Sequence, residues 1–323
     1  MREFATPRVF VSRCIEHDHC RYNGNIIASE AVRNMQGKVD IVTTCPEADI
    51  GLGIPRDPIR VVKKDDKLRL MQPATERDVT REMVEFSGDY LDNLGEIDGF
   101  VLKADSPSCG PDNVKIYPST DKVPPLDRGA GFFASEVARR FADTPSETEG
   151  RLTNFTIREN FYTQIYALAD FRASREKGGK SDLVDFHARN KFLIMSYSEE
   201  DKKRLGRIVA NQENRGAGEL FEEYEKELRG AFCVCSRVGS NINVLMHALG
   251  YFKEELSSEE KNFFLENLES YREDKIPLSV PLNIMRSLII RFDQDYLAGQ
   301  TFFEPYPEGL VEITDSGKGR KLR

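Results

Sequence analysis

The order of short apolar runs along the chain constrains its fold more than any other feature. The runs at Arg8–Ser12 (RVFVS), Val39–Thr43 (VDIVT) and Gly99–Lys103 (GFVLK) are brief and rich in β-branched residues, which is typical of buried parallel strands. Helical patterns at Ala28–Gln36 and Asp78–Leu94 lie between them. Because strands that alternate with helices form parallel βαβ units, the sequence predicts an α/β N-terminal domain with a small, mostly parallel sheet.

Three other segments complete this predicted domain and its boundary. Phe132–Phe141 is expected to be its last helix, and the charged segment Ile59–Met71 is expected to form a hairpin or loop insertion that turns at Asp65 and Asp66. The polar stretch Asp143–Gly150 (DTPSETEG) is the best candidate for a linker. Since it carries few apolar anchors, we expect limited proteolysis to begin there.

Beyond residue 150 the strand-like runs disappear, and the sequence predicts an all-α helical domain. Ser181 is expected to cap a helix that runs through Phe186 and Leu193, with Asp182 in its first turn. The other expected helices are Asn154–Arg175, Glu199–Asn211, Gly218–Gly250, Ser258–Arg272 and Pro281–Tyr296. These patterns divide the chain into an α/β domain at residues 1–146, a helical domain at 151–315 and a tail at 316–323.

The net charge of −8 over 323 residues bears on partners and compartment. No basic surplus is available to neutralise phosphates, which argues against non-specific binding of nucleic acid, although a local basic patch stays open. No apolar run approaches the roughly 20 residues that cross a bilayer, and the N-terminal apolar stretch is too short for a signal peptide. We therefore expect a cytoplasmic protein whose six cysteines stay reduced.

Three of the six cysteines share one position relative to the predicted strands. Cys14 follows the first strand, Cys45 ends the second and Cys109 follows the third. Because the ligands of open parallel sheets gather outside the carboxyl ends of the strands, we expect the three thiols to converge there. Converging thiolates in a reducing compartment suit an iron–sulfur cluster or zinc. The simpler alternative is three small buried side chains at strand ends.

Two polar residues beside these cysteines fit a reactive site. Glu47 stands two residues after Cys45 and is a candidate acid or base. Ser106 stands three residues before Cys109 and supplies a hydroxyl. We therefore interpret the predicted sheet edge as a candidate metal centre with its own acid or base.

Three segments resemble the signatures of the thiouracil-desulfurase family of bacteria and archaea. They are VSRC–x5–CRYNG, CPEADIGLGIPR and LKADSPSCG, of which SPSCG is the most specific part. This resemblance covers roughly residues 6–145. Residues 150–315 resemble the YbgA-like helical domain through DLVDFHARNKFLIMSYS and DQDYLAGQTFFEPYP. The two domains are known to occur fused, so each resemblance supports the other.

The resemblance implies a site and a reaction. In the family, three cysteines hold a 4Fe–4S cluster and leave one iron without a protein ligand, which here implies Cys14, Cys45 and Cys109 as ligands. Glu47 and Ser106 match family positions implicated in catalysis. The open iron would polarise the thiocarbonyl group, Glu47 would activate water or shuttle a proton, and Ser106 would orient the substrate. The implied activity is a non-redox desulfuration of a thiouracil-like compound or thiolated nucleotide that releases sulfide.

The segment after the first cysteine departs from the family pattern. Where relatives have an apolar CLLG-type stretch, this chain has His17, Asp18, His19 and Cys20. Cys20 as a fourth ligand would close the open iron and favour a binding or sensing protein without turnover. Cys14, Cys20 and the two histidines are alternatively a local zinc site. In the simplest interpretation the histidines face solvent.

Two weaker features complete the set of candidates. Cys233 and Cys235 lie two residues apart in what we expect to be one helix, where they would point in nearly opposite directions and could not chelate one metal. His187 lies in a predicted helix, where a lone histidine is usually a packing residue. We expect neither feature to take part in chemistry.

Overall fold

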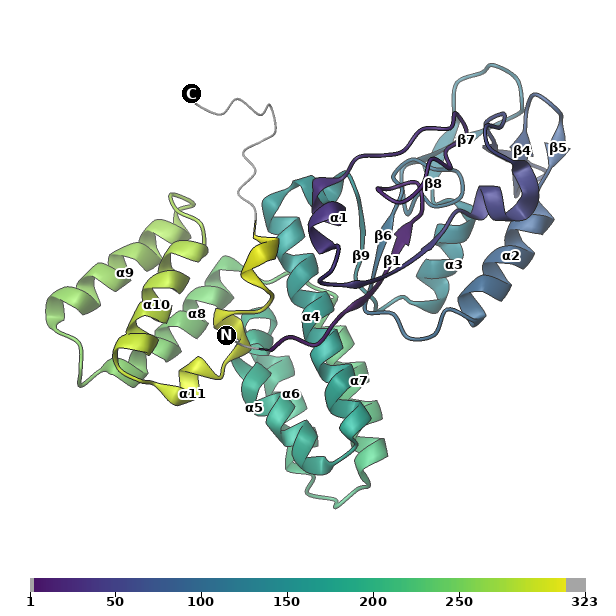
Figure 1. Cartoon of the computed structure of the whole chain (residues 1–323). Helices are drawn as coiled ribbons and strands as arrows, with labels where there is room; N and C mark the ends of the chain where they lie inside the picture. Colours follow the sequence, from purple (N-terminus) through teal and green to yellow (C-terminus); the bar gives the residue numbers. More distant parts are fainter. Residues whose placement is uncertain (1–2, 312–323) are drawn as a thin grey trace. The chain divides into compact units, whose positions relative to one another are not determined.

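The computed structural model of the chain describes residues 3–311, which divide into two compact units. One unit is built on Thr6–Ile165 and the other on Tyr166–Glu308, so that their boundary falls inside the 23-residue helix α4 (Phe155–Lys177) (Figure 1). The predicted tail at residues 316–323 lies outside the described residues. The predicted domain limits, 1–146 and 151–315, stay predictions.

A four-stranded parallel sheet forms the centre of the first unit. Its strands are β2 (Asp40–Thr44), β1 (Arg8–Ser12), β6 (Gly99–Leu102) and β9 (Ser146–Thr148), in that spatial order. Every neighbouring pair is parallel. The three strands predicted from their apolar runs are therefore confirmed, and they are neighbours. Their carboxyl ends consequently meet at one edge of the sheet.

Helices cover both faces of this sheet. On one face, α2 (Thr80–Asp92) and α3 (Phe132–Arg140) pack against Phe10 and Phe100. On the other face, the first turns of α4 lie so close that a Cβ atom on Gly99 would stand 2.6 Å from the Ile165 side chain. The hydroxyl of Tyr162 in α4 donates to the backbone carbonyl of Ala31 in α1 (Glu30–Met35), at 3.0 Å. The predicted α/β fold is confirmed.

The prediction of a linker at Asp143–Gly150 is wrong, because the middle of this segment is the edge strand β9. The backbone N–H of Phe100 donates to the carbonyl of Pro145 at 2.8 Å, at the start of this pairing. At its end, the carboxylate of Glu149 accepts from Lys103 Nζ at 2.6 Å and from the Ala104 N–H at 2.9 Å. A polar sequence was mistaken for a loop, although its side chains hold it to the sheet. It is no longer expected to be the first site of proteolysis.

A second, mixed sheet of five strands lies in the same unit. Its spatial order is β5 (Arg77–Asp78), β4 (Lys67–Gln72), β3 (Arg60–Lys64), β7 (Val114–Tyr117) and β8 (Asp127–Gly129). The predicted hairpin is confirmed as β3 and β4, which are antiparallel. Its turn residues, Asp65 and Asp66, both have positive φ angles, 49° and 57°, as a tight two-residue hairpin turn requires. The other strands of this sheet were not predicted.

The second unit contains helices and no strand among its described residues. Its helices after α4 are α5 (Lys180–Tyr197), α6 (Glu199–Ala210), α7 (Ala217–Phe232), α8 (Val238–Leu249), α9 (Ser258–Arg272), α10 (Ser279–Arg291) and α11 (Asp295–Ala298). Aromatic rings from α4, α5 and α7 meet in the core, where Phe171 stacks on Tyr224 and Phe186 contacts both. The predicted all-α architecture is confirmed. None of the helices described at residues 3–311 is long and apolar enough to span a membrane.

The single helix expected over Gly218–Gly250 is two helices with a break between Phe232 and Val238. The segment between them, CVCSR, is poor in strong helix formers. In the break, the Ser236 hydroxyl bonds to the backbone carbonyl of Ser196 at 3.0 Å and to Asn241 Oδ1 at 2.8 Å. A serine side chain that binds elsewhere competes with the helix, which explains the interruption.

Two other helix ends differ from the sequence prediction. Helix α5 is capped at Gly179 and not at Ser181, because the Asp182 carboxylate accepts the Gly179 N–H at 3.0 Å. The helix expected over Pro281–Tyr296 ends at Arg291, and a short helix follows at Asp295–Ala298. In both cases tertiary or capping bonds moved a boundary within an element whose type was predicted correctly.

Candidate active site

A cavity of about 430 Å³ opens at the carboxyl ends of β1, β2 and β6. Cys14, Cys45 and Cys109 all line it, as does Cys20. The predicted convergence of three strand-end cysteines is thus confirmed. Glu47 and Ser106 line the same cavity.

The ends of β1 and β2 hold the first two cysteines in place. The N–H of Arg13 donates to the Thr44 carbonyl at 2.9 Å, which continues the pairing of the two strands as far as the cysteines. Arg13 also binds the Asp49 carboxylate through two nitrogens, each at 3.1 Å. The same carboxylate accepts the Thr44 hydroxyl and, at 3.3 Å, the Cys45 N–H. These hydrogen bonds therefore hold the ends of β1 and β2 together up to the point where the loops that follow the two strands separate.

Cys109 lies in a compact turn that follows β6. Its N–H donates to Ser106 Oγ at 3.1 Å, and the Gly110 N–H donates to the Ser106 carbonyl at 2.8 Å. A Cβ on Gly110 would stand 2.8 Å from the Ser106 carbonyl oxygen, so only glycine fits there. The turn is then fixed to α3, because the Ala134 N–H donates to the Ser108 carbonyl at 3.0 Å.

Three of the four cysteines of this cavity, Cys20, Cys45 and Cys109, are buried, and Cys14 is partly buried. Cys20 is fully buried, and its thiol bonds with those of Cys14 and Cys45. The bond with Cys14, together with burial, raises the pKa of Cys20 to about 11. The bond with Cys20 and then burial raise the pKa of Cys45, and burial raises the pKa of Cys109 to about 12. As free thiols these groups are protonated at neutral pH and weak nucleophiles, whereas a bound metal deprotonates a coordinating thiol.

Glu47 is held by four side-chain hydrogen bonds from three neighbours. Its Oε2 accepts from Arg56 Nε at 3.0 Å and from Nη2 at 2.7 Å. Its Oε1 accepts from the Ser108 hydroxyl at 2.7 Å and from the Ser106 hydroxyl at 3.4 Å. The side chain of Arg56 is only 3% exposed and that of Glu47 12%. This carboxylate is fixed at the cavity wall by a largely buried ion pair.

Arg56 and Ser108 are the residues that the sequence prediction missed at this site. Arg56 also donates to the backbone carbonyls of Cys20, at 2.9 Å, and Gly53, at 3.1 Å. It therefore connects the carboxylate to the loop that carries the fourth cysteine. The signal for both residues was present in the quoted motifs, since Arg56 ends CPEADIGLGIPR and Ser108 lies within SPSCG.

We expect Arg56→Ala to lower the free energy of unfolding of the metal-free chain by about 3 kcal/mol. The substitution leaves a largely buried carboxylate without its cation, a change that costs about 3–5 kcal/mol elsewhere, and the two serine hydroxyls offset part of it. Urea denaturation followed by circular dichroism measures this value. Arg81→Ala is the matched control, because it breaks the exposed Arg81–Glu85 pair and should leave the free energy unchanged. Equal stability of both variants would show that the buried pair does not stabilise the fold.

The local zinc site considered for the first loop is not formed. His17, Asp18 and His19 are exposed, and neither histidine lines the cavity. His17 Nδ1 lies 2.6 Å from the Ile15 carbonyl and His19 Nδ1 lies 3.3 Å from the Gly24 carbonyl. Within residues 3–311, no three histidine, cysteine or carboxylate side chains are grouped to hold a single metal ion. The solvent-facing interpretation of both histidines is confirmed.

The donor set at the cavity nevertheless fits an iron–sulfur cluster. Cysteine thiolates are the usual protein ligands of such clusters, and here they come from separate strand ends around a cavity. A cluster is larger than one ion, so its ligands need not surround a common point as those of a single zinc do. The thiols at strand ends are therefore the groups that would hold a cluster.

The two weaker candidates lie outside this cavity. Cys233 and Cys235 are exposed in the break between α7 and α8, so the expectation that they lie in one helix is wrong. His187 Nδ1 lies 2.9 Å from the Tyr224 hydroxyl in the helical core. Burial, and then the charges of Lys191 and Lys202, lower the pKa of His187 to about 4.

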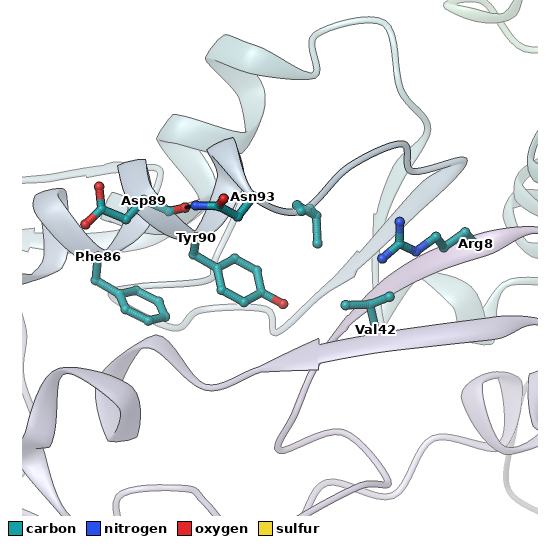
Figure 2. A pocket seen from close by; sticks show the side chains of 7 residues that line it. Arg8, Val42, Phe86, Asp89, Tyr90 and Asn93 are labelled. Carbon is teal, nitrogen blue, oxygen red and sulfur yellow. Dashed lines mark hydrogen bonds between the residues drawn. The ribbon is translucent and has the colours of Figure 1, made fainter.

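A second cavity, of about 450 Å³, lies between α2 and the strands β1 and β2 (Figure 2). Phe86 stacks on Tyr90, whose hydroxyl points towards the side where Val42 and Arg8 lie. Asn93 donates to the Asp89 carbonyl at 2.7 Å. This cavity contains no cysteine and no hydroxyl bonded to a carboxylate. The thiol-lined cavity is therefore the better candidate for an active site.

The fold and the thiol-lined cavity define a class of protein in which an α/β unit presents strand-end cysteines and is joined to a helical unit. Residues 9–149 match the family described as 2-thiouracil desulfurase, and residues 191–307 match a family described as protein of unknown function DUF1722. Residues 9–149 therefore form an N-terminal domain of the 2-thiouracil desulfurase family. The resemblance noted from its three cysteine-containing segments is confirmed.

Two curated relatives each match a part of the chain. The uncharacterized protein YbgA of Escherichia coli (strain K12) is 26% identical over 156 residues, which are 48% of this chain and 92% of the relative. The uncharacterized protein YbbK of Bacillus subtilis (strain 168) is 34% identical over 109 residues, which are 32% of this chain and 72% of the relative. A solved structure described as the [4Fe-4S]-dependent thiouracil desulfidase TudS is 25% identical. It covers 46% of this chain and 94% of its own, with a TM-score of 0.35.

Proposed function

We propose that the protein hydrolyses the C=S bond of a small thiocarbonyl compound, thiouracil-like or a thiolated nucleotide, with Cys14, Cys45 and Cys109 holding a 4Fe–4S cluster. One observation carries the proposal. Three thiols from three strand ends line one cavity together with a carboxylate that is fixed by hydrogen bonds. The match of residues 9–149 to the desulfurase family supports it. The overall reaction converts R₂C=S and water into R₂C=O and H₂S, so that no electrons are exchanged with an outside partner.

The proposed roles of the cluster and of the protein residues are separate. When bound, a cluster with one iron free of protein ligands supplies Lewis acidity towards sulfur, which polarises the thiocarbonyl group. Glu47 accepts the proton of the attacking water, and Arg56 keeps the carboxylate turned towards the cavity by occupying Oε2. Ser106 presents a hydroxyl at the same wall and orients the substrate.

The proposal is tested by anaerobic reconstitution of the full chain with iron and sulfide. We expect about four irons per chain, on the basis of the proposed cluster type. The reconstituted protein should then release sulfide and uracil in equal amounts from 2-thiouracil. A chain that binds iron stably but releases no sulfide from any thiocarbonyl compound would contradict the enzymatic function.

A second candidate function rests on Cys20, which the structure places with Cys14 and Cys45 in the cavity. A fourth thiolate on the cluster would remove the open iron and leave a protein that binds or senses without turnover. We favour the enzyme, because a carboxylate fixed beside the thiols has no role in a closed cluster.

We expect Cys20→Ala to keep the iron content and most of the desulfuration activity, because three thiolates suffice to hold a cluster with one open iron. Iron analysis and sulfide release on the same reconstituted sample measure the two quantities. Loss of the cluster in this variant would make Cys20 a ligand and would favour the binding or sensing protein.

A further inference from the structure

Three side chains at the cavity wall form a directed chain of hydrogen bonds. Ser108 Oγ lies 2.7 Å from Glu47 Oε1 and 3.0 Å from Ser106 Oγ. Ser108 is 1% exposed, whereas Ser106 is only partly buried. The chain therefore runs from the cavity surface, through a buried hydroxyl, to the carboxylate.

The direction of this chain follows from counting donors and acceptors. Ser106 Oγ accepts the N–H of Cys109 at 3.1 Å and that of Ser108 at 3.3 Å, which engages both of its lone pairs. Its remaining role is to donate its own proton. The Ser108 proton is directed to Glu47, since that contact of 2.7 Å is far shorter than the 3.9 Å to the Cys109 sulfur. Ser108 Oγ is thus the acceptor for the Ser106 proton.

The carboxylate at the end of this series of hydrogen bonds is fixed as well. Both contacts of Arg56 with Glu47 go to Oε2, so Oε1 is the oxygen that receives a proton. The carboxylate cannot rotate to exchange its two oxygens without breaking the ion pair with an arginine that is 3% exposed. The pathway from Ser106 to Glu47 is therefore built into the folded chain.

We infer that Ser108 relays a proton between Ser106 and Glu47 Oε1 during desulfuration, an inference that rests on the proposed function. As water attacks the thiocarbonyl carbon, the C=S π electrons move onto sulfur and Ser106 Oγ takes a proton from the water, in place of the longer of its two N–H contacts, the one of 3.3 Å from Ser108. Ser106 gives its own proton to Ser108 Oγ. Ser108 gives its own proton to Glu47. Water has then lost one proton, Glu47 has gained one, and a C–O bond has formed. The C–S bond then breaks as the new C–O bond becomes a carbonyl. The sulfide leaves with the proton that returns from Glu47 through the same hydroxyls and with the remaining proton of the attacking hydroxyl, so that R₂C=S and water give R₂C=O and H₂S.

The two N–H groups that point at Ser106 support this role. They come from Cys109 and Ser108, and they stabilise negative charge on the serine oxygen at the moment its proton leaves. A direct contact of 3.4 Å from Ser106 to Glu47 offers a longer and slower route when Ser108 is absent. Loss of the relay should therefore slow the reaction without abolishing it.

The experiment compares Ser108→Ala with Ser87→Ala in the reconstituted full chain acting on 2-thiouracil. Ser87 is also 1% exposed and donates to the Met83 carbonyl in α2, away from the cavity, so it controls for loss of a buried hydroxyl. We expect kcat of Ser108→Ala to fall about tenfold or more, below the full range for losing an acid or base because the longer route remains. KM, iron content and cluster absorbance should be unchanged, and Ser87→Ala should match the wild-type protein.

A second readout separates a relay from a structural hydroxyl. When kcat is measured in mixtures of H₂O and D₂O, transfer of two or more protons in one step gives a curved dependence on the deuterium fraction. We expect the stronger curvature for the wild-type chain, in which three protons move, and a weaker curvature for Ser108→Ala, in which two protons move through the direct contact of Ser106 with Glu47. Wild-type kcat, the same curvature, or a loss of iron parallel to the loss of activity would each overturn the relay. Absence of sulfide release by the wild-type protein would instead contradict the proposed function, and the relay with it.

Discussion

Cys45→Ser is expected to leave the reconstituted protein without a cluster and without measurable desulfuration. Cys45 directly follows β2 and lines the cavity with the other thiols. A neutral hydroxyl is a poor substitute for a thiolate at iron, so the substitution removes a ligand. The fold should persist, because the serine hydroxyl can still donate to the Cys20 carbonyl that now lies 3.6 Å from the Cys45 sulfur. Iron analysis and the visible absorbance of the cluster measure the loss.

The control for this variant is Cys233→Ser, which changes an exposed cysteine in the break between α7 and α8. It should retain iron and activity in full. Iron content equal to the wild type in Cys45→Ser would exclude this thiol from the ligand set. A loss of circular dichroism in parallel with the loss of iron would make it a structural residue of the sheet edge.

Glu47→Gln is expected to lower kcat by about 10²-fold or more while it keeps the cluster, the scale usual for removing an acid or base. Glutamine has nearly the same shape and can still accept from Arg56, so the cavity wall should be retained. It cannot accept the proton that the relay delivers to Oε1. Sulfide release on samples of equal iron content measures the effect.

The matched control is Glu147→Gln, because this carboxylate is 16% exposed, close to the 12% of Glu47, and pairs with Arg151 outside the cavity. Its activity should equal that of the wild type. Equal loss of iron in Glu47→Gln and Cys45→Ser would make Glu47 a ligand or a structural residue. Unchanged turnover would remove it from the mechanism.

The convergence of Cys14, Cys45 and Cys109 could be predicted because each cysteine follows a strand that can be identified from the local sequence alone. A short β-branched run identifies a strand, and the order of strands and helices makes the strands parallel, which brings their ends together. Position along the chain was therefore enough to place three thiols at one edge. The structure bears out this placement with all three around one cavity.

The position of Cys20 and the partner of Glu47 could not be obtained in this way. Cys20 reaches the cavity because its loop returns to the sheet edge through a bridge between Ile15 and Ile27. Arg56 meets Glu47 although the two residues are nine positions apart in the sequence. These contacts depend on how irregular loops close, and no periodic pattern in the sequence encodes loop closure.

Chain segments with short or polar strands were the other source of error. The strand β9 has three residues and lies in a polar stretch, so its sequence resembled a linker. The second sheet was missed beyond its hairpin for the same reason, since β5, β7 and β8 have two, four and three residues. Pairing with a neighbour, and not intrinsic preference, makes such segments strands.

The most direct test of the account is desulfuration of 2-thiouracil by the reconstituted protein in ¹⁸O-labelled water, without added reductant or oxidant. Hydrolysis of the C=S bond predicts uracil that carries one ¹⁸O atom, formed in equal amount with sulfide. Uracil without the label, or turnover that depends on an electron donor, would contradict a hydrolytic reaction at this site.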